Sequence, residues 1–477
     1  MSAELAQRRG SNAGQQAAAE NNAPPSPAGP LEVGAPVRMP PSLPLPTYRQ
    51  TLRFMTDPLR FHLEASSRLG DVWAVKIVTR DEPVVMTSHP DHIKSLFTAD
   101  AADAPSLTGE SPLRPILGPT SVLTLIGDQH MRLRRLLLPP FHGEAVARYV
   151  QMITDVTERE IDSWPVGRPF ALAERMQAIT MDVIMAGVFG IQCPPVPGTA
   201  EYKMREVFSR LMRMSTHPLW LLVELSNARR AKARGVLRAT LAVVDRHLYA
   251  AIARRRADPQ SADGRDILSM LMQARDDNGE PLTDAELRDQ LITLVLAGHE
   301  TTANSLAWTF ERMLRRPAAR DTLCELVRAD DSAADAYVEA TIYEGMRMRP
   351  VIPLLARLVK RPWQLGEFTV PVNTPVAISV LALHHREDLY PDPYVFRPER
   401  FVDRKPGTYT WIPFGGGIRR CLGAELALAE QRVVVRAIAA RTDLAAADPA
   451  PERARQRNVT MIPRKGGRVV VNSKRPR

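Results

Sequence analysis

The chain has 477 residues, of which 63 are Lys or Arg and 53 are Asp or Glu, so its formal net charge at pH 7 is +10. This length exceeds that of an ordinary single domain, yet no internal repeat and no inner linker is visible, which favours one large domain. The basic excess is dispersed and no nucleic-acid module is recognisable, so we expect no nucleic-acid partner, and three cysteines are too few for a disulfide framework.

Residues 1–45 differ in composition from the rest of the chain. Ala, Gly, Asn, Gln and Pro dominate and few large apolar side chains are available for burial, so we expect a disordered leader followed by one domain over residues 46–477. No stretch approaches the roughly 18 to 20 apolar residues that span a bilayer, and no apolar region follows Arg8 and Arg9 as a secretory signal requires. We therefore expect a cytoplasmic protein without a membrane span.

Three short runs have the composition of β-strands, namely Val72–Val78, Pro83–Ser88 and Thr374–Val380. Elsewhere, apolar residues recur mostly at the three- and four-residue spacing of helices. These patterns predict a mainly α protein with small β-sheets.

The segment HMRLRR begins at His130 and contains Arg134, four residues later. This spacing places the two side chains on one face of a helix, although an ordinary surface histidine remains an alternative for His130. Further along, the apolar run WLLVEL (220–225) is typical of a buried helix face or of a hydrophobic lid.

The longest predicted helix lies between a capping box, Thr283 with Glu286, and a stop at Pro317. It contains the sequence AGHETT (297–302). Gly298 with the following hydroxyl side chains predicts a local opening of the helical hydrogen bonds, which would admit a water or an oxygen molecule. Glu300 and Thr301 would then form an acid and alcohol pair; taken alone, a solvent-facing Glu and a Thr bonded to its own helix is the more common arrangement.

Two further motifs carry charge. In EGMR, Glu344 and Arg347 are three residues apart on a helix and can pair, and the later loop sequence FRPERF offers Arg400 as a third member. If the three are buried together, removing one strands a charge. Arg357 follows the apolar stretch VIPLLA.

The sequence FGGGIRRCLG (414–423) contains Cys421 directly before a helix-forming segment. Free N–H groups and the positive end of the helix dipole stabilise a thiolate at such a position. The three glycines allow a tight turn and a close approach to a flat ligand. Cys193 and Cys324 are interpreted as ordinary unreactive thiols.

These motifs resemble those of the cytochrome P-450 family of haem-thiolate monooxygenases. Every fixed place of the family's cysteine signature is filled, and AGHETT, EGMR and HMRLRR occur upstream in the family's order, so the resemblance covers the chain from about Leu45 to its end. Many members have Trp where this chain has His130. The signature residues are Phe414, Gly417, Arg419, Cys421 and Gly423.

The resemblance implies the cytochrome P-450 fold as a single large haem domain, with haem b as the cofactor. Cys421 would be the axial ligand of the iron, and Glu300 with Thr301 would deliver protons on the opposite side. Glu344, Arg347 and Arg400 would form a structural network that holds the cysteine loop. The cofactor-binding residues would be His130, Arg134, Arg357 and Arg419 at the propionates, together with Ala297, Phe414, Gly417 and Gly423.

The implied activity is insertion of one oxygen atom from dioxygen into a lipophilic small molecule, by hydroxylation or epoxidation. Electrons would come from NAD(P)H through a separate reductase and an acidic ferredoxin or flavodoxin, steered by arginines near the cysteine. A haem-thiolate isomerase, lyase or peroxygenase is the main alternative, and a haem sensor is a third. The steering arginines are Arg132, Arg134, Arg135, Arg419, Arg420 and Arg432; the substrate would meet residues 107–126 and 351–355 with Ala297 and Thr301.

Overall fold

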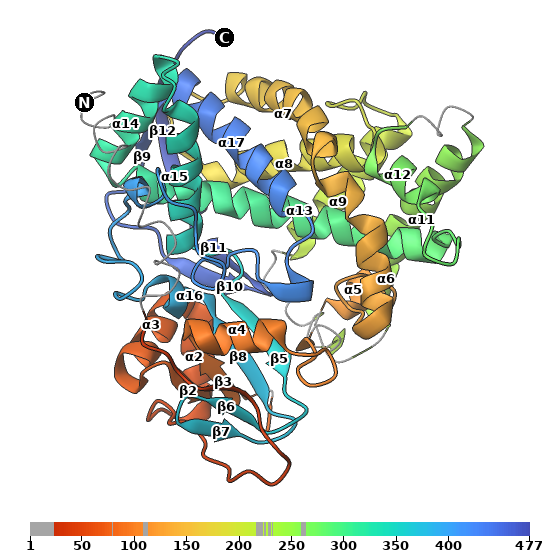
Figure 1. The fold of residues 1–477 in the computed structure, drawn as a ribbon. Helices are drawn as coiled ribbons and strands as arrows, with labels where there is room; N and C mark the ends of the chain where they lie inside the picture. Colours follow the sequence, from red (N-terminus) through yellow and green to blue (C-terminus); the bar gives the residue numbers. More distant parts are fainter. Residues whose placement is uncertain are drawn as a thin grey trace.

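A computed structural model of the protein describes residues 23–78, 80–107, 113–215, 223, 226–227, 230, 232–258 and 264–477. Figure 1 shows a large helical part, crossed by the long helix α13, and a smaller part in which short strands lie beside α2, α3 and α4. The segment 220–225, expected as a lid or a buried helix face, lies outside the described residues except for Val223.

The predicted mainly α architecture with small sheets is confirmed. Among the described residues, no helix is both long and apolar enough to cross a membrane. The helices are α2 (Thr47–Thr56), α3 (Pro58–Leu69), α4 (Pro90–Thr98), α5 (Arg114–Leu117), α6 (Gly127–Leu137), α7 (Glu144–Asp162), α8 (Leu172–Phe189), α9 (Ala200–Ser215), α11 (Gly235–Ala257), α12 (Ile267–Gln273), α13 (Asp284–Met313), α14 (Pro317–Arg328), α15 (Ala334–Met348), α16 (Val380–His384) and α17 (Ala424–Arg441).

The strands form four small sheets, in the orders β2-β3-β8-β5, β1-β6-β7, β4-β12-β9 and β10-β11. All three predicted strand segments are present and lie side by side, as β2, β3 and β8. The strands are β1 (Ala28–Pro30), β2 (Val72–Val75), β3 (Val84–Thr87), β4 (Phe170–Ala171), β5 (Leu354–Leu358), β6 (Trp363–Leu365), β7 (Phe368–Val370), β8 (Pro375–Ser379), β9 (Thr442–Ala446), β10 (Ala454–Arg457), β11 (Thr460–Pro463) and β12 (Arg468–Lys474).

The expected boundary of the leader is wrong in its second half. Residues 28–30 form β1, which pairs antiparallel with β6, and Leu43 is buried in a core beneath the β2-β3-β8-β5 sheet. His89, just before α4, and His92 of α4 also bind this segment, through Pro24 O (2.9 Å) and Ser26 Oγ (2.9 Å). These partners are distant in sequence, so composition alone did not reveal them. The folded part therefore begins before residue 45.

Helix α13 begins at the predicted capping box. Thr283 Oγ1 accepts the N–H of Glu286, while the Glu286 carboxylate accepts the N–H of Thr283. Its 30 residues extend over roughly 45 Å at 1.5 Å per residue, so it crosses the whole helical part. Most of its side chains are buried, polar ones included, because α8, α15 and the β11 strand pack around it.

Gly298 allows α8 to pack closely against α13. A Cβ atom at this position would lie 2.6 Å from Cδ1 of Ile184, which is too short for any side chain. The helix is continuous through residues 297–302, so the predicted local opening at Gly298 is absent from this structure. The glycine is explained by helix packing instead.

Candidate active site

The cysteine loop lies between a short 3₁₀ turn, Gly417–Arg419, and the start of α17 at Ala424. Cys421 is therefore just ahead of a helix, as predicted, and its N–H donates to Phe414 O at 2.9 Å. Gly417 has a φ of +61°, and a Cβ there would lie 2.3 Å from Phe97 O. The glycines thus permit the tight turn, and the close approach that they allow in this structure is to Phe97 of α4.

The Cys421 thiol is accessible to solvent, yet protein atoms surround it closely enough that burial raises its pKa above the ordinary value. The N–H of Gly423 and the charges of Arg134 and Arg420 oppose this rise but do not outweigh it. We expected the helix start to stabilise a thiolate by itself; the structure shows that burial dominates. A metal ion coordinated by this sulfur would favour the thiolate, because the charge of the ion lowers the pKa of a coordinating thiol.

Helix α13 presents an accessible stripe in a section that is otherwise largely buried. Leu294, Ala297, Gly298 and Thr301 follow the i, i+3, i+4, i+7 pattern, and each has exposed surface, with Ala297 the most open. Residues of β5, among them Leu354 and Leu355, are also partly accessible. A mostly apolar set of side chains from central elements thus remains in contact with open space.

Four basic side chains near the cysteine have no acidic partner in the part of the chain that the structure describes. Among the described residues, none of His130, Arg134, Arg357 and Arg419 forms an ion pair. The Arg357 and Arg419 guanidinium groups donate only to backbone carbonyls, and burial lowers the pKa of each to about 10. Burial and the charges of the three arginines lower the pKa of His130 to about 4. Sequence motifs from distant parts of the chain therefore meet in one cluster.

The donor set of this cluster fits an anionic ligand. Nδ1 of His130 is buried and has no hydrogen-bond partner among the described residues, and a buried polar atom left without a partner costs roughly 1 to 3 kcal/mol. Three guanidinium groups without carboxylates carry uncompensated positive charge. Two propionates of the expected haem would supply acceptors and negative charge together. The residues thus fit the cofactor that the resemblance implies.

Glu344, Arg347 and Arg400 meet as predicted. Arg347 donates to both oxygens of Glu344, at 2.7 and 2.9 Å, and both side chains are fully buried. Nε of Arg400 lies 3.4 Å from Oε1 of Glu344, and the N–H of Arg397 donates to the same oxygen at 3.0 Å. This carboxylate therefore connects α15 with the loop that precedes the cysteine sequence.

His384, at the end of α16, extends this network and was not singled out from the sequence. Its Nδ1 lies 3.2 Å from Arg347 O, and its Nε2 accepts the N–H of Ile412 at 2.9 Å. Since Nε2 accepts, the proton must be on Nδ1, and burial keeps the ring neutral by lowering its pKa to about 3. Ile412 O in turn accepts the N–H of Gly415 in the cysteine loop. No motif marks His384, because its partners are known only from the fold.

Glu300 and Thr301 are not brought together. The Glu300 carboxylate is bound by Arg457 of β10, with Nε at 2.9 Å, and by Thr460 Oγ1 of β11 at 2.9 Å. The Thr301 hydroxyl donates to Ala297 O at 2.6 Å, within its own helix. Neighbouring residues of a helix point about 100° apart, so the two side chains face different elements. The predicted acid and alcohol pair is wrong for this conformation.

Backbone carbonyls in this turn of α13 accept additional hydrogen bonds from side chains. Ala297 O takes the Thr301 hydroxyl, His299 O takes Thr180 Oγ1 of α8 at 3.1 Å, and Glu300 O takes Asn304 Nδ2 at 2.8 Å. When the helical hydrogen bond of such a carbonyl lengthens, the second donor still satisfies the oxygen, so the free-energy cost of opening the turn is smaller. The turn is closed here, but three of its four carbonyls have substitute donors.

Half of the six arginines expected to form a basic patch are neutralised by ion pairs. Only Arg420 among the remaining ones is exposed and has no ion pair within the described residues. The expected patch is thus smaller than the sequence suggested. The ion pairs are Arg132 with Asp276 (2.6 Å) and Glu286 (2.8 Å), Arg135 with Asp277 (3.1 Å), and Arg432 with Glu339 (2.8 Å).

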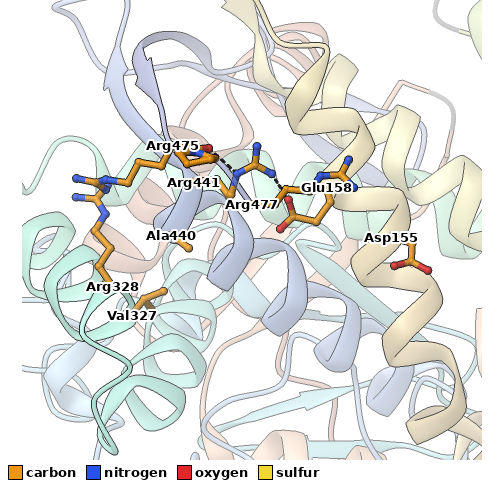
Figure 2. Close-up of a pocket in the computed structure, with 9 residues that line it drawn as sticks. Asp155, Glu158, Val327, Arg328, Ala440, Arg441, Arg475 and Arg477 are labelled. Atoms are coloured by element: carbon orange, nitrogen blue, oxygen red, sulfur yellow. Dashed lines mark hydrogen bonds and ion pairs between the residues drawn. The ribbon is translucent and has the colours of Figure 1, made fainter.

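Another cleft, of about 730 Å³, lies between α7, α14, α17 and the C-terminal residues, as Figure 2 shows. Arg441, at the last residue of α17, lines it, whereas Cys421 precedes the first residue of that helix. The two ends of α17 are roughly 26 Å apart at 1.5 Å per residue, so this cleft is separate from the cysteine site. Its Arg441 pairs with Glu158 and Asp162, which ties α17 to α7.

The sequence model of the family described as Cytochrome P450 matches residues 38–469. "Putative cytochrome P450 137" of Mycobacterium tuberculosis is 35% identical over 445 residues, 90% of either chain. "Putative cytochrome P450 135B1" of Mycobacterium bovis is 36% identical over 434 residues, which are 89% of this chain and 90% of that one.

Solved structures agree on the fold. The structure titled "Retinoic acid bound cyanobacterial CYP120A1" has a TM-score of 0.76 at 22% identity and covers 92% of this chain and 100% of its own. That of a "cytochrome P450DA heme domain" has a TM-score of 0.76 at 21% identity, covering 92% and 99%. The chain belongs to the cytochrome P450 family of haem-dependent monooxygenases.

Proposed function

We propose that the protein is a ferredoxin-dependent monooxygenase that oxidises a lipophilic small molecule at a haem bound between Cys421 and the accessible stripe of α13. The single observation that supports this best is the carboxylate-free cluster of His130, Arg134, Arg357 and Arg419 beside the cysteine. A cluster of this kind is costly without an anionic ligand, and it stands next to the one exposed cysteine of the described residues.

In this proposal Cys421 ligates the iron, and the four basic side chains bind the two propionates. Phe414, Gly417 and Gly423 shape the loop on the sulfur side, and Ala297 of α13 borders the opposite side. When bound, the haem supplies the iron at which dioxygen is activated, and a thiolate ligand favours cleavage of the oxygen–oxygen bond. The buried network of Glu344, Arg347 and Arg400 keeps the loop in place through His384.

For proton delivery we propose Thr301, whose hydroxyl lies on the accessible stripe. Because it donates its own proton to Ala297 O, its oxygen is free to accept a hydrogen bond from a water in the site. Glu300 is assigned the role of proton donor only after it leaves Arg457 and Thr460. In this proposal the Thr301 hydroxyl is already in the site, whereas the Glu300 carboxylate must first break its bonds to Arg457 and Thr460.

We propose a lipophilic substrate because accessible residues of α13, and the β5 residue nearest the cysteine loop, are apolar: Leu294, Ala297 and Leu355. The solved neighbour whose title names retinoic acid binds a molecule of this lipophilic kind, although its likeness to this chain is one of fold. For electron supply we propose a separate acidic ferredoxin or flavodoxin with its reductase, and Arg420 as one contact, in a cytoplasmic setting.

Two measurements test the proposal. The carbon monoxide complex of the reduced protein should show the long-wavelength Soret band of a thiolate-ligated haem, and Cys421→Ser should abolish it. NAD(P)H with a ferredoxin and its reductase should then place one labelled oxygen atom from dioxygen in the product of a lipophilic substrate. Turnover with peroxide but not with electrons and dioxygen would favour a peroxygenase, and turnover needing neither would favour an isomerase or lyase.

A further inference from the structure

The loop between α5 and α6 is held by a row of polar side chains on α13. Asp289 Oδ2 accepts the N–H of Thr120 at 3.0 Å and its hydroxyl at 2.7 Å. Gln290 accepts the N–H of Val122 at 2.9 Å and donates to Thr120 O at 2.6 Å. The hydroxyls of Ser121 and Thr293 lie 2.7 Å apart. Three neighbouring residues of the loop are therefore each bonded to α13.

These contacts are buried and leave little freedom. Gln290 is fully buried, and Asp289 is 5% exposed. Gly118, at the start of the loop, has a φ of +91°, and a Cβ there would lie 2.2 Å from the Asp289 carboxylate. Arg288 donates to Asp289 Oδ1 at 2.9 Å and so fixes the second oxygen of that carboxylate. These bonds and the close approach at Gly118 hold the loop against the helix.

The other side of the same loop holds Arg419. Its Nη1 donates to Val122 O at 3.1 Å, and its Nη2 donates to Leu125 O. Val122 is thus shared: its N–H is bonded to Gln290 and its carbonyl to Arg419. A direct chain of hydrogen bonds runs from α13 through this loop to the guanidinium that precedes Cys421 by two residues.

Arg419 is oriented by backbone carbonyls and not by a carboxylate. A carboxylate would orient Arg419 but would also cancel its charge, whereas backbone carbonyls orient the guanidinium and leave its positive charge uncompensated. Since burial makes that charge costly, the group keeps its orientation only as long as the carbonyls stay in place. The position of the loop therefore decides where Arg419 directs its remaining N–H groups.

We infer that Gln290, supported by Asp289 and Thr293, is a positioning residue for Arg419 and acts through the loop of residues 118–125. The inference rests on the proposed role of Arg419 at the haem carboxylates. It gives α13 a second role. The helix borders the site with Ala297 and Thr301, and through Gln290 it also determines the orientation of Arg419, the proposed partner of the haem carboxylates.

The test compares Gln290→Met with a matched control, Gln50→Met. Gln50 of α2 is 2% exposed and clamps a loop in the same way: it accepts the N–H of Lys76 at 3.1 Å and donates to Leu45 O at 2.9 Å. It belongs to α2, which lies beside the short strands in the smaller part of the molecule (Figure 1). Both variants remove buried amide hydrogen bonds to loop backbone at similar side-chain volume. Gln50 also donates to Ser42 Oγ and Leu43 O, each at 3.3 Å, so Gln50→Met should lower the free energy of unfolding at least as much as Gln290→Met.

Only Gln290→Met should change the haem site. Transfer of haem to apomyoglobin should become about tenfold faster, as is typical when an outer partner of a ligand is lost. In a double-mutant cycle, Gln290→Met added to Arg419→Gln should cause little further acceleration, because the first acts through the second. Additive effects in the cycle would overturn the inference, whereas equal transfer rates for the Gln290 and Gln50 variants would overturn only the role of Arg419 at the haem carboxylates.

Hydrogen exchange of the full chain as purified separates this inference from the proposed function. Gln290→Met should increase amide exchange in residues 118–125 and also in residues 415–422, whereas Gln50→Met should affect neither. If exchange spreads to the cysteine loop but haem transfer is unchanged, the positioning of Arg419 stands and its role at the propionates fails. If exchange rises only in residues 118–125, the positioning inference itself fails.

Discussion

Replacement of Glu344 by Ala is the most direct test of how the cysteine loop is held. The carboxylate accepts hydrogen bonds from Arg347, from the N–H of Arg397 and from Arg400, and it is fully buried. Its removal leaves the buried Arg347 guanidinium with only the carbonyls of His384 and Pro393. Breaking a buried pair from one side costs about 3 to 5 kcal/mol, because the remaining charge has no counter-ion.

Glu339→Ala provides a control on the same helix. Glu339 pairs with Arg432 at 2.8 Å, but its side chain is 39% exposed and that of Arg432 is 42% exposed. A half-exposed pair of this kind contributes about 1 kcal/mol or less. Both variants remove one carboxylate from α15, so their difference isolates the effect of burial.

The assay is urea denaturation of the haem-loaded protein, followed by the haem content of each variant after purification. Glu344→Ala should lose several times more stability than Glu339→Ala and should retain little haem, while Glu344→Gln, which keeps an acceptor for Arg397 N–H, should fall between them. Equal losses for the two Ala variants, or full haem occupancy in Glu344→Ala, would refute the reasoning.

Three further predictions follow from single side chains. Thr301→Ala should divert reducing equivalents to hydrogen peroxide, measured as peroxide per NAD(P)H, whereas Thr309→Ala, which removes the same back-bonded hydroxyl from a buried turn of α13, should not. Arg457→Gln should release Glu300 and change the pH profile of turnover; an unchanged profile would mean that this carboxylate takes no part in proton delivery. Because burial lowers the pKa of His384 to about 3, the unfolded chain binds more protons than the folded one below its ordinary pKa, so stability should fall as pH decreases from about 6.5 towards 3, and His384→Asn should flatten that slope in urea titrations.

Much of the site followed from local sequence. The capping box of Thr283 and Glu286 sets the start of α13 because both partners are three residues apart. Glu344 and Arg347 pair because they share a helix face. Cys421 precedes α17 because apolar periodicity begins just after it. In each case the physical cause lies within about one turn of helix.

Tertiary structure decided which groups are paired and which are free. Glu300 binds Arg457, 157 residues away, so an acid that the motif placed beside Thr301 faces a β-hairpin instead. β1 is ordered by pairing with β6, more than 330 residues later, despite a composition that predicted disorder.

Arg132 and Arg419 also differ in charge compensation because folding gives them different partners, although both stand in basic sequence motifs. Arg132 is neutralised by Asp276 and Glu286, whereas Arg419 meets only carbonyls and keeps its charge. The sequence determined the helices, the cysteine loop and the residue types available for chemistry, because these depend on neighbours along the chain. Charge and proton position depend on partners brought together by folding, and only the tertiary structure determined those.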